Sequence, residues 1–166
     1  MSTESSIPIK LMVKNLTKNL NDSLLIINKI KEYIVSTVKW NKHYTALPLK
    51  APWEVYNKKT GNSAEINMLF LVMIREAGFQ CLPVLTATRS EGSIQSLYPF
   101  LSQFNHLVCY SIIDSVEYIL DATKPLLSCN TLPEDLINQK AWVLSKPHKW
   151  IDLKGYRDSK IMSIIT

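Results

Sequence analysis

The chain has 166 residues, 46% of them apolar, which suits a single folded domain spanning residues 1–166 and excludes a disordered chain. Its formal net charge of +5 is uneven, because residues 1–60 hold ten lysines and only four acidic side chains. These lysines are scattered, with no arginine cluster and no interleaved aromatic residues, so we interpret them as a solvated face and expect no nucleic-acid partner.

Hydropathy and cysteine usage exclude further classes. No run approaches the about 20 apolar residues that a membrane-spanning helix needs, and no signal peptide is visible. Cys81, Cys109 and Cys129 lack the CxxC spacing of a zinc site, so we expect no metal and no other cofactor. Cys81 and Cys109 fall in strand-like runs and are expected to be buried. The final stretch "SKIMSIIT" is strand-like and stops in mid-pattern, which favours a piece of a longer protein.

The first third of the chain predicts one clear helix. Residues 7–20 are expected to be irregular or strand-like. Asp22 can cap a helix over residues 23–38, whose apolar positions follow a period of 3.6. The following connection, residues 39–61, contains two prolines and two tryptophans, and loops this long are uncommon unless they build a site.

A second helix begins in the stretch "TGNSAEINMLFLVMIREAGF" and is expected to be the most buried element. Asn62 and Glu65 are three residues apart and suit a capping box, and Gly78 suits a left-handed C-terminal cap. Ser63 lies in the first turn. Because Asn62 would supply the cap, we expect Ser63→Ala to leave stability nearly unchanged.

The rest of the chain predicts strands. "CLPVLTAT" is expected to form a strand, with Pro83 at a sheet edge or near the start of the strand. After a loop over residues 89–104, "NHLVCYSII" and "VEYILDAT" predict a hairpin around Asp114 and Ser115. A loop with a short helix near Pro133–Asn138 follows, and "AWVLS" and "KWIDL" predict two short strands. Helices followed by antiparallel strands indicate an α+β fold.

The hairpin brings two polar residues together. A two-residue turn pairs Ile113 with Val116, and this register places His106 and Asp121 on one face, within hydrogen-bonding reach. Such a pair is two thirds of a nucleophile–base–orienter triad, and a helix N-terminus such as that at Ser63 suits the third member. From spacing alone, structural roles stay open: helix initiation for Ser63, a hydrogen-bonded strand residue for His106 and a turn former for Asp121.

Five blocks between about Trp40 and Asp121 together resemble the transglutaminase-like superfamily, which shares the papain-like cysteine protease fold. They read, in order, "VKWN", "TGNSAEINMLFLVMIREAGF", "CLPVLTATR", "FNHLV" and "YILDAT". The resemblance is greatest to the branch found in large multidomain envelope proteins of bacteria. It implies a central helix packed on an antiparallel sheet, neighbouring domains in a longer chain, and a location in the periplasm or cell envelope.

The resemblance also assigns site residues. His106 matches the catalytic histidine and Asp121 the catalytic aspartate, while Ser63 falls where the family carries its cysteine nucleophile. The Ser63 N–H would be one oxyanion donor, and the indole of Trp40 or Trp53 another, with core packing as the alternative for both tryptophans. The residues expected to border the cleft are Trp40, Trp53, Asn62, Arg89, Tyr98, Phe104 and Asn105; for the aromatic loop residues, packing onto the core is the alternative.

Serine at the cysteine position changes the expected chemistry. A helix N-terminus and an imidazolium can hold a thiol as thiolate, but a hydroxyl needs a base during attack and a well-placed oxyanion hole. We therefore expect a catalytically degenerate domain that binds peptide, protein or glycan, or that has a structural role. The alternative is an active Ser–His–Asp amide hydrolase or acyltransferase.

Overall fold

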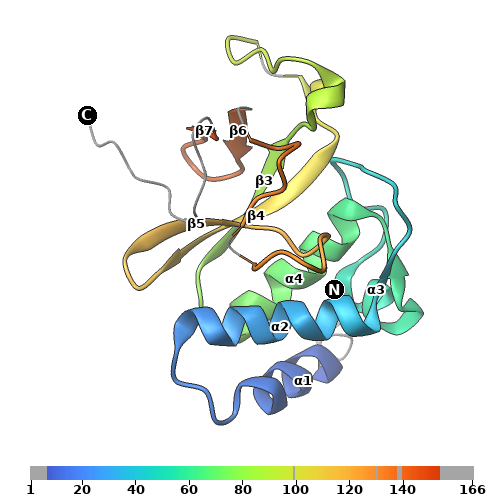
Figure 1. Cartoon of the computed structure of the whole chain (residues 1–166), viewed down its shortest axis with the longest axis vertical. Coiled ribbons are helices and arrows are strands. Elements are labelled where there is room, and N and C mark those ends of the chain that lie inside the picture. Colours follow the sequence, from blue (N-terminus) through green and yellow to red (C-terminus); the bar gives the residue numbers. More distant parts are fainter. Residues whose placement is uncertain (1–6, 99, 130, 138–139, 154–166) are drawn as a thin grey trace.

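The computed structural model describes residues 7–98, 100–129, 131–137 and 140–153. Figure 1 shows α1 (Ile7–Thr17) and α2 (Ser23–Thr37) side by side, and α4 (Ser63–Glu76) between them and a curled antiparallel sheet. The expected α+β architecture, with a central helix packed on a sheet, is confirmed.

The sheet has five strands in the order β5-β4-β3-β6-β7, and every neighbouring pair is antiparallel. The strands are β3 (Cys81–Thr86), β4 (His106–Ile113), β5 (Val116–Leu120), β6 (Lys140–Val143) and β7 (Lys149–Asp152). β3 is central and pairs on both sides, so of the two positions predicted for Pro83 the one near the start of the strand holds. At this position β6 does not yet pair with the strand.

The predicted hairpin of β4 and β5 is confirmed. Ile113 lies opposite Val116, and Asp114 and Ser115 form the turn with positive φ angles of 51° and 67°. Positive φ at both central residues is the backbone of the tight turn that matches the twist of a hairpin. This turn fixes which residues of the two strands share a face.

The two predicted helices are also confirmed. The Asp22 side chain accepts from the N–H of Leu25 at the start of α2. At α4, Asn62 and Glu65 form the expected capping box, and Gly78 has a φ of 96° beyond the helix end. Ten of the fourteen residues of α4 are buried, which makes it the central element of the core.

Two helices were not expected. Residues 7–17 form α1 rather than an irregular or strand-like segment, because Ile9 and Val13, four residues apart, are buried on one face against α2 and α4. The connection 39–61 contains α3 (Pro52–Lys58), flanked by the two-residue strands β1 (Lys39–Trp40) and β2 (Thr60–Gly61), which pair in parallel.

The C-terminal predictions have mixed outcomes. Residues 134–137 form a turn, so no helix is present in the part of Pro133–Asn138 that the structure describes. The strands predicted from "AWVLS" and "KWIDL" are β6 and β7, while "SKIMSIIT" lies outside the described residues. None of the helices in the described ranges has the length and apolar character needed to cross a bilayer.

Candidate functional site

His106 and Asp121 form a buried hydrogen-bonded pair. His106 is the first residue of β4 and Asp121 follows directly after β5, so the hairpin register places them side by side. Nε2 of His106 and Oδ2 of Asp121 are 2.9 Å apart, and the side chains are 0% and 1% exposed. The hydrogen bond predicted from the hairpin spacing is therefore confirmed.

Asp121 is held as a carboxylate. Burial by itself raises its pKa, but His106 and the hydrogen bonds from Thr123 outweigh burial and hold the pKa of Asp121 well below its usual range. The backbone N–H and hydroxyl of Thr123 donate to Oδ1 at 2.8 and 2.7 Å. An ionised Asp121 orients the imidazole of His106 by accepting from Nε2.

Asn67 ties this pair to α4, and the sequence analysis missed it. Its side-chain amide donates to Oδ1 of Asp121 at 3.2 Å and to the carbonyl of Leu107 at 2.7 Å, and it accepts from the N–H of Ala122 at 2.8 Å. The available signal was its spacing: Asn67 is four residues after Ser63 and so lies on the same helix face.

Ser63 is fully buried at the first turn of α4, and its polar groups are occupied by backbone. Its hydroxyl accepts from the N–H of Thr45 at 2.9 Å and donates to the carbonyl of Thr45 at 3.3 Å. Its own N–H donates to the carbonyl of His43 at 3.0 Å. The expectation that this N–H is available to an oxyanion is therefore wrong.

The carbonyl of His43 also accepts from a second expected donor. The indole N–H of Trp40 donates to the same oxygen at 3.2 Å. Two of the groups nominated for an oxyanion hole, the Ser63 N–H and the Trp40 indole, thus converge on one point, and the chain's own carbonyl oxygen occupies that point.

Tyr44, between the two residues that hold Ser63, covers His106. Its ring stands edge-on to the imidazole with centroids 5.1 Å apart, and Trp40 stands edge-on to Tyr44 at the same distance. The hydroxyl of Tyr44 donates to Asp135 at 3.3 Å and accepts from Lys124 at 2.9 Å. The aromatic ring is thereby fixed over the histidine.

The structure joins two of the three residues predicted to form a triad by a hydrogen bond. Nε2 of His106 is used by Asp121, and among the described residues its Nδ1 has no hydrogen-bond partner although it is buried. Ser63 is related to the pair through segment 43–45, which contacts Ser63 through His43 and Thr45 and contacts His106 through Tyr44.

Most of the expected cleft residues have structural partners. Asn62 caps α4, and Asn105 exchanges two 2.8 Å hydrogen bonds with Thr88. Arg89 donates through its backbone N–H to the backbone carbonyl of Asp135 and through Nε to the carbonyl of Ile137. These contacts hold the loops beside the sheet in place.

The aromatic cleft residues divide into two groups. Phe104 is buried and packs against Trp142 and Trp150, so for this residue the alternative of core packing holds. Tyr98 is 83% exposed and Trp53, on α3, is also exposed. Trp40 is half-buried and lines a pocket.

The cysteines offer no substitute nucleophile. Cys81, Cys109 and Cys129 are buried, and burial, followed by contact with Cys81, raises the pKa of Cys109 well above its usual range. Within the described residues, no three His, Cys, Asp or Glu side chains gather as a metal ion would need.

A helix N-terminus beside a His–Asp pair on an antiparallel sheet defines an α+β domain of the papain-like class. The family model of the transglutaminase-like superfamily matches residues 10–124, which include Ser63, His106 and Asp121. The chain belongs to this superfamily.

Solved structures share the fold at low sequence identity. A candidate protease from Parabacteroides distasonis superposes with a TM-score of 0.67 and 16% identity, over 90% of this chain and 28% of that one. A candidate cysteine protease from Cytophaga hutchinsonii gives 0.54 and 14%, over 72% of this chain and 38% of that one. The chain thus spans well under half of either protein. No curated protein matches it.

Proposed function

We propose that this transglutaminase-like domain is catalytically silent, with Ser63 at the nucleophile position, and that it serves as a binding or structural module of a longer protein. The observation that carries the proposal is the carbonyl of His43, which accepts from both the Ser63 N–H and the Trp40 indole. A substrate oxyanion would need these two donors.

The hydroxyl of Ser63 supports the same proposal. A serine becomes a nucleophile when a base within hydrogen-bonding reach takes its proton during attack. Here the hydroxyl donates to the carbonyl of Thr45, and neither nitrogen of His106 hydrogen-bonds to it. Ser63 is also 0% exposed, so an acyl group has no access to its oxygen.

On this proposal, His106 and Asp121 are structural. Their pair joins the start of β4 to the end of the hairpin, and Asn67 connects both to α4. A buried hydrogen-bond network of this kind can fix the relative positions of the elements that it joins.

A second candidate function, a Ser–His–Asp amide hydrolase or acyltransferase, has one observation in its favour. The donors from Ser63 and Trp40 already point at a common position, and Nδ1 of His106 is without a partner among the described residues. Withdrawal of segment 43–45 would release the Ser63 N–H and the Trp40 indole from the carbonyl of His43 and would remove Tyr44 from His106. Catalytic hydrogen bonds in unliganded enzymes often form only on substrate binding.

A fluorophosphonate probe separates the two functions. The protein and a Ser63→Ala control are incubated with the probe, and intact mass is measured. We expect no adduct on either protein. A single adduct that is absent from Ser63→Ala would contradict silence and establish the hydrolase.

The variant Ser63→Cys tests whether the site still activates a nucleophile. The introduced thiol lies at a helix N-terminus, where thiolates are stabilised, but it is covered by segment 43–45. We expect iodoacetamide to modify it no faster than Cys81 or Cys109, as followed by peptide mass. Selective alkylation at this position would show that the activating environment persists.

The role in a longer chain is tested on the full-length protein. The candidate proteases that share this fold are several times longer than the matched region, since it covers 28% and 38% of them. We propose that neighbouring domains, in an envelope protein, are among the surfaces this domain contacts. Slower amide hydrogen exchange on its surface in the full-length protein than in the isolated domain would support this; identical exchange would contradict it.

A further inference from the structure

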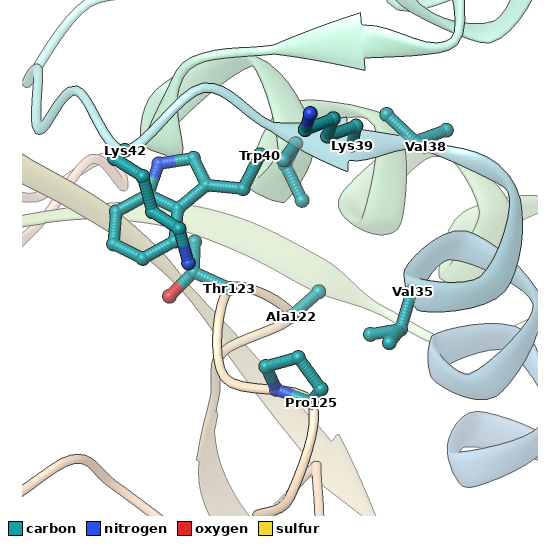
Figure 2. A pocket seen from close by; sticks show the side chains of 9 residues that line it. Val35, Val38, Lys39, Trp40, Lys42, Ala122, Thr123 and Pro125 are labelled. Carbon is teal, nitrogen blue, oxygen red and sulfur yellow. The ribbon is translucent and has the colours of Figure 1, made fainter.

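A pocket of about 230 Å³ opens beside Trp40 and is lined by Ala122 and Thr123, the two residues that follow Asp121 in the chain (Figure 2). It lies between the end of α2, strand β1 and the segment that follows β5. Its lining residues are Val35, Val38, Lys39, Trp40, Lys42, Ile66, Ala122, Thr123 and Pro125. None of the roles described above for the residues of the site involves this pocket.

The lining is divided into an apolar part and a cationic part. Valine, isoleucine, alanine and proline side chains supply the apolar part, with the Trp40 ring beside them, as Figure 2 shows. The charged lining residues are Lys39 and Lys42, and no carboxylate lines the pocket. A third ammonium, that of Lys124, is 5.1 Å from the centroid of the Trp40 ring.

Among the described residues, Lys39 and Lys42 form no ion pair, whereas the Lys124 ammonium interacts electrostatically with Asp135 and Asp121 and donates to the Tyr44 hydroxyl. Asp121 is buried and held by His106 and Thr123, and Asp135 accepts from the hydroxyl of Tyr44. The pocket therefore combines apolar walls with a positive rim, which suits an apolar group that carries an anion.

The backbone conformation of Lys42 places its side chain at the pocket. Lys42 has a φ of 71°, in the left-handed region that non-glycine residues seldom adopt. In this conformation its ammonium lies 4.9 Å from the centroid of the Trp40 ring, at the pocket. Unfavourable backbone conformations cluster at ligand-binding positions.

The size of the pocket limits the ligand. Pockets that hold drug-sized molecules measure about 300–1,000 Å³, and this pocket is smaller. It accommodates one amino-acid side chain. The group that places an apolar side chain and a carboxylate on a single carbon atom is the C-terminal residue of a peptide.

We propose that the pocket binds the C-terminal residue of a peptide, with an apolar side chain between Val38 and Pro125 and the carboxylate beside Lys42 and Lys124. This proposal deepens the proposed function by naming the class of ligand that the binding module takes. It rests on the proposed function in one respect, namely that the domain binds its ligand without reacting with it.

The test compares peptides that differ in one group. Acetyl-Gly-Gly-Leu with a free carboxylate is titrated into the protein, and the indole N–H signal of Trp40, assigned with Trp40→Phe, is followed by NMR. We expect saturable binding in the millimolar range or tighter. The same peptide with a C-terminal amide, and a peptide acid that ends in Gly instead of Leu, should each bind about tenfold more weakly. Added salt should weaken the binding of the peptide that ends in Leu with a free carboxylate.

Lysine variants locate the carboxylate. Lys42→Gln and Lys124→Gln should each weaken binding of the acid several-fold and leave the amide unaffected. Lys59→Gln is the matched control, because Lys59 also has a positive φ and also lies over an aromatic ring, that of Tyr56, but does not line the pocket. Melting by circular dichroism verifies that the variants fold.

Several outcomes would overturn the proposal: equal binding of acid and amide, an equal effect of Lys59→Gln, or no binding of any peptide at millimolar concentration. If hexanoate binds as tightly as the peptide, the ligand of the pocket is a free aliphatic acid and not a peptide, which overturns the proposal. The fluorophosphonate result is independent. Labelling together with peptide binding overturns silence and leaves the pocket, whereas no labelling and no binding overturns the pocket alone.

Discussion

Ser63 makes hydrogen bonds through its hydroxyl and its N–H to a segment about twenty positions earlier in the chain. This changes what its substitution is expected to do. Capping of α4 is supplied by Asn62, as predicted, but the hydroxyl has partners of its own in Thr45. The expectation that Ser63→Ala leaves stability nearly unchanged therefore no longer holds.

We predict that Ser63→Ala lowers the free energy of unfolding by about 1–3 kcal/mol, because the backbone N–H and carbonyl of Thr45 lose their partner. Urea denaturation measures the change. Ser36→Ala is the control: its hydroxyl bonds to Tyr33 on an exposed helix face, so its loss should cost less than about 0.5 kcal/mol. Equal losses in the two variants would show that the contacts to Thr45 do not stabilise the fold.

The Asp121 carboxylate predicts a pH dependence of stability. Because its pKa is lower in the folded chain than the about 3.9 of an unfolded aspartate, its ionisation stabilises the fold above about pH 4 and the contribution declines as pH falls below that value. Asp121→Asn should lower the free energy of unfolding by about 3–5 kcal/mol at pH 7. This difference should shrink towards pH 3.

The control for that measurement is Glu32→Gln. Glu32 is exposed and pairs with Lys29 at 3.4 Å, and exposed pairs contribute about 0–1 kcal/mol. A loss for Asp121→Asn that stays constant from pH 7 to pH 3 would mean that the charge of Asp121 is not what stabilises the fold.

How far the site could be predicted depends on the kind of contact. The His106–Asp121 hydrogen bond follows from a two-residue turn, because strand periodicity then fixes which side chains meet. The contacts of His43 and Tyr44 could not be predicted, since they belong to an irregular segment with no period to read. Their partners are set by the tertiary fold alone.

At the scale of elements, the N-terminus of α4 is fastened at a second point. Glu65 is 1% exposed and accepts from the backbone N–H groups of Asn62, Leu49 and Lys50, and from the Lys50 ammonium at 3.1 Å. Glu65, the partner of Asn62 in the capping box, thus also holds the covering segment. Ser63 and Glu65 together fix that segment on α4 at residues 43–45 and 49–50.

We predict that Glu65→Gln lowers the free energy of unfolding by about 2 kcal/mol or more, since hydrogen bonds to charged groups contribute about 1.5–3 kcal/mol each. Amide hydrogen exchange at Leu49 and Lys50 should accelerate. Glu54→Gln is the control, because this glutamate at the start of α3 accepts from one backbone N–H, that of Ala51. If exchange at Leu49 and Lys50 is unchanged in Glu65→Gln, the carboxylate does not hold the segment.

The two helices that the sequence did not predict are shorter than the two that it did. α1 shows only two fully buried apolar positions, Ile9 and Val13, and α3 spans two turns with Val55 as its one buried residue. Isolated helices of this length are marginal, so packing against α4 rather than local propensity determines their state. α2 and α4 were predictable because their apolar faces repeat over three to four turns.

At the scale of the whole molecule, the loop between β3 and β4 gathers exposed apolar side chains. Leu97 and Phe100 are 85% and 52% exposed, between β3 and β4. We predict that brief chymotrypsin treatment cleaves this loop first, after Leu97 or Phe100, as mass spectrometry of the fragments would identify. First cleavage in segment 43–50 would contradict the fastening by Ser63 and Glu65.

The nicked protein should remain a single particle in gel filtration and separate only in denaturant. β3 and β4, which lie on either side of the cut, pair along six residue positions, and both pack against α4. Separation of the fragments in native buffer would show that this pairing depends on the intact loop.

The short parallel ladder of β1 and β2 closes residues 41–59 at their base, with Lys39 opposite Thr60 and Trp40 opposite Gly61. Lengthening such a closed excursion costs little, about 0.6 kcal/mol for each doubling of its length. An insertion at an exposed position within it leaves both ends in place, while Val55 of α3 stays packed in the core with α4. The cover over His106 can therefore change in length at its exposed positions while the strands β1 and β2 hold its two ends.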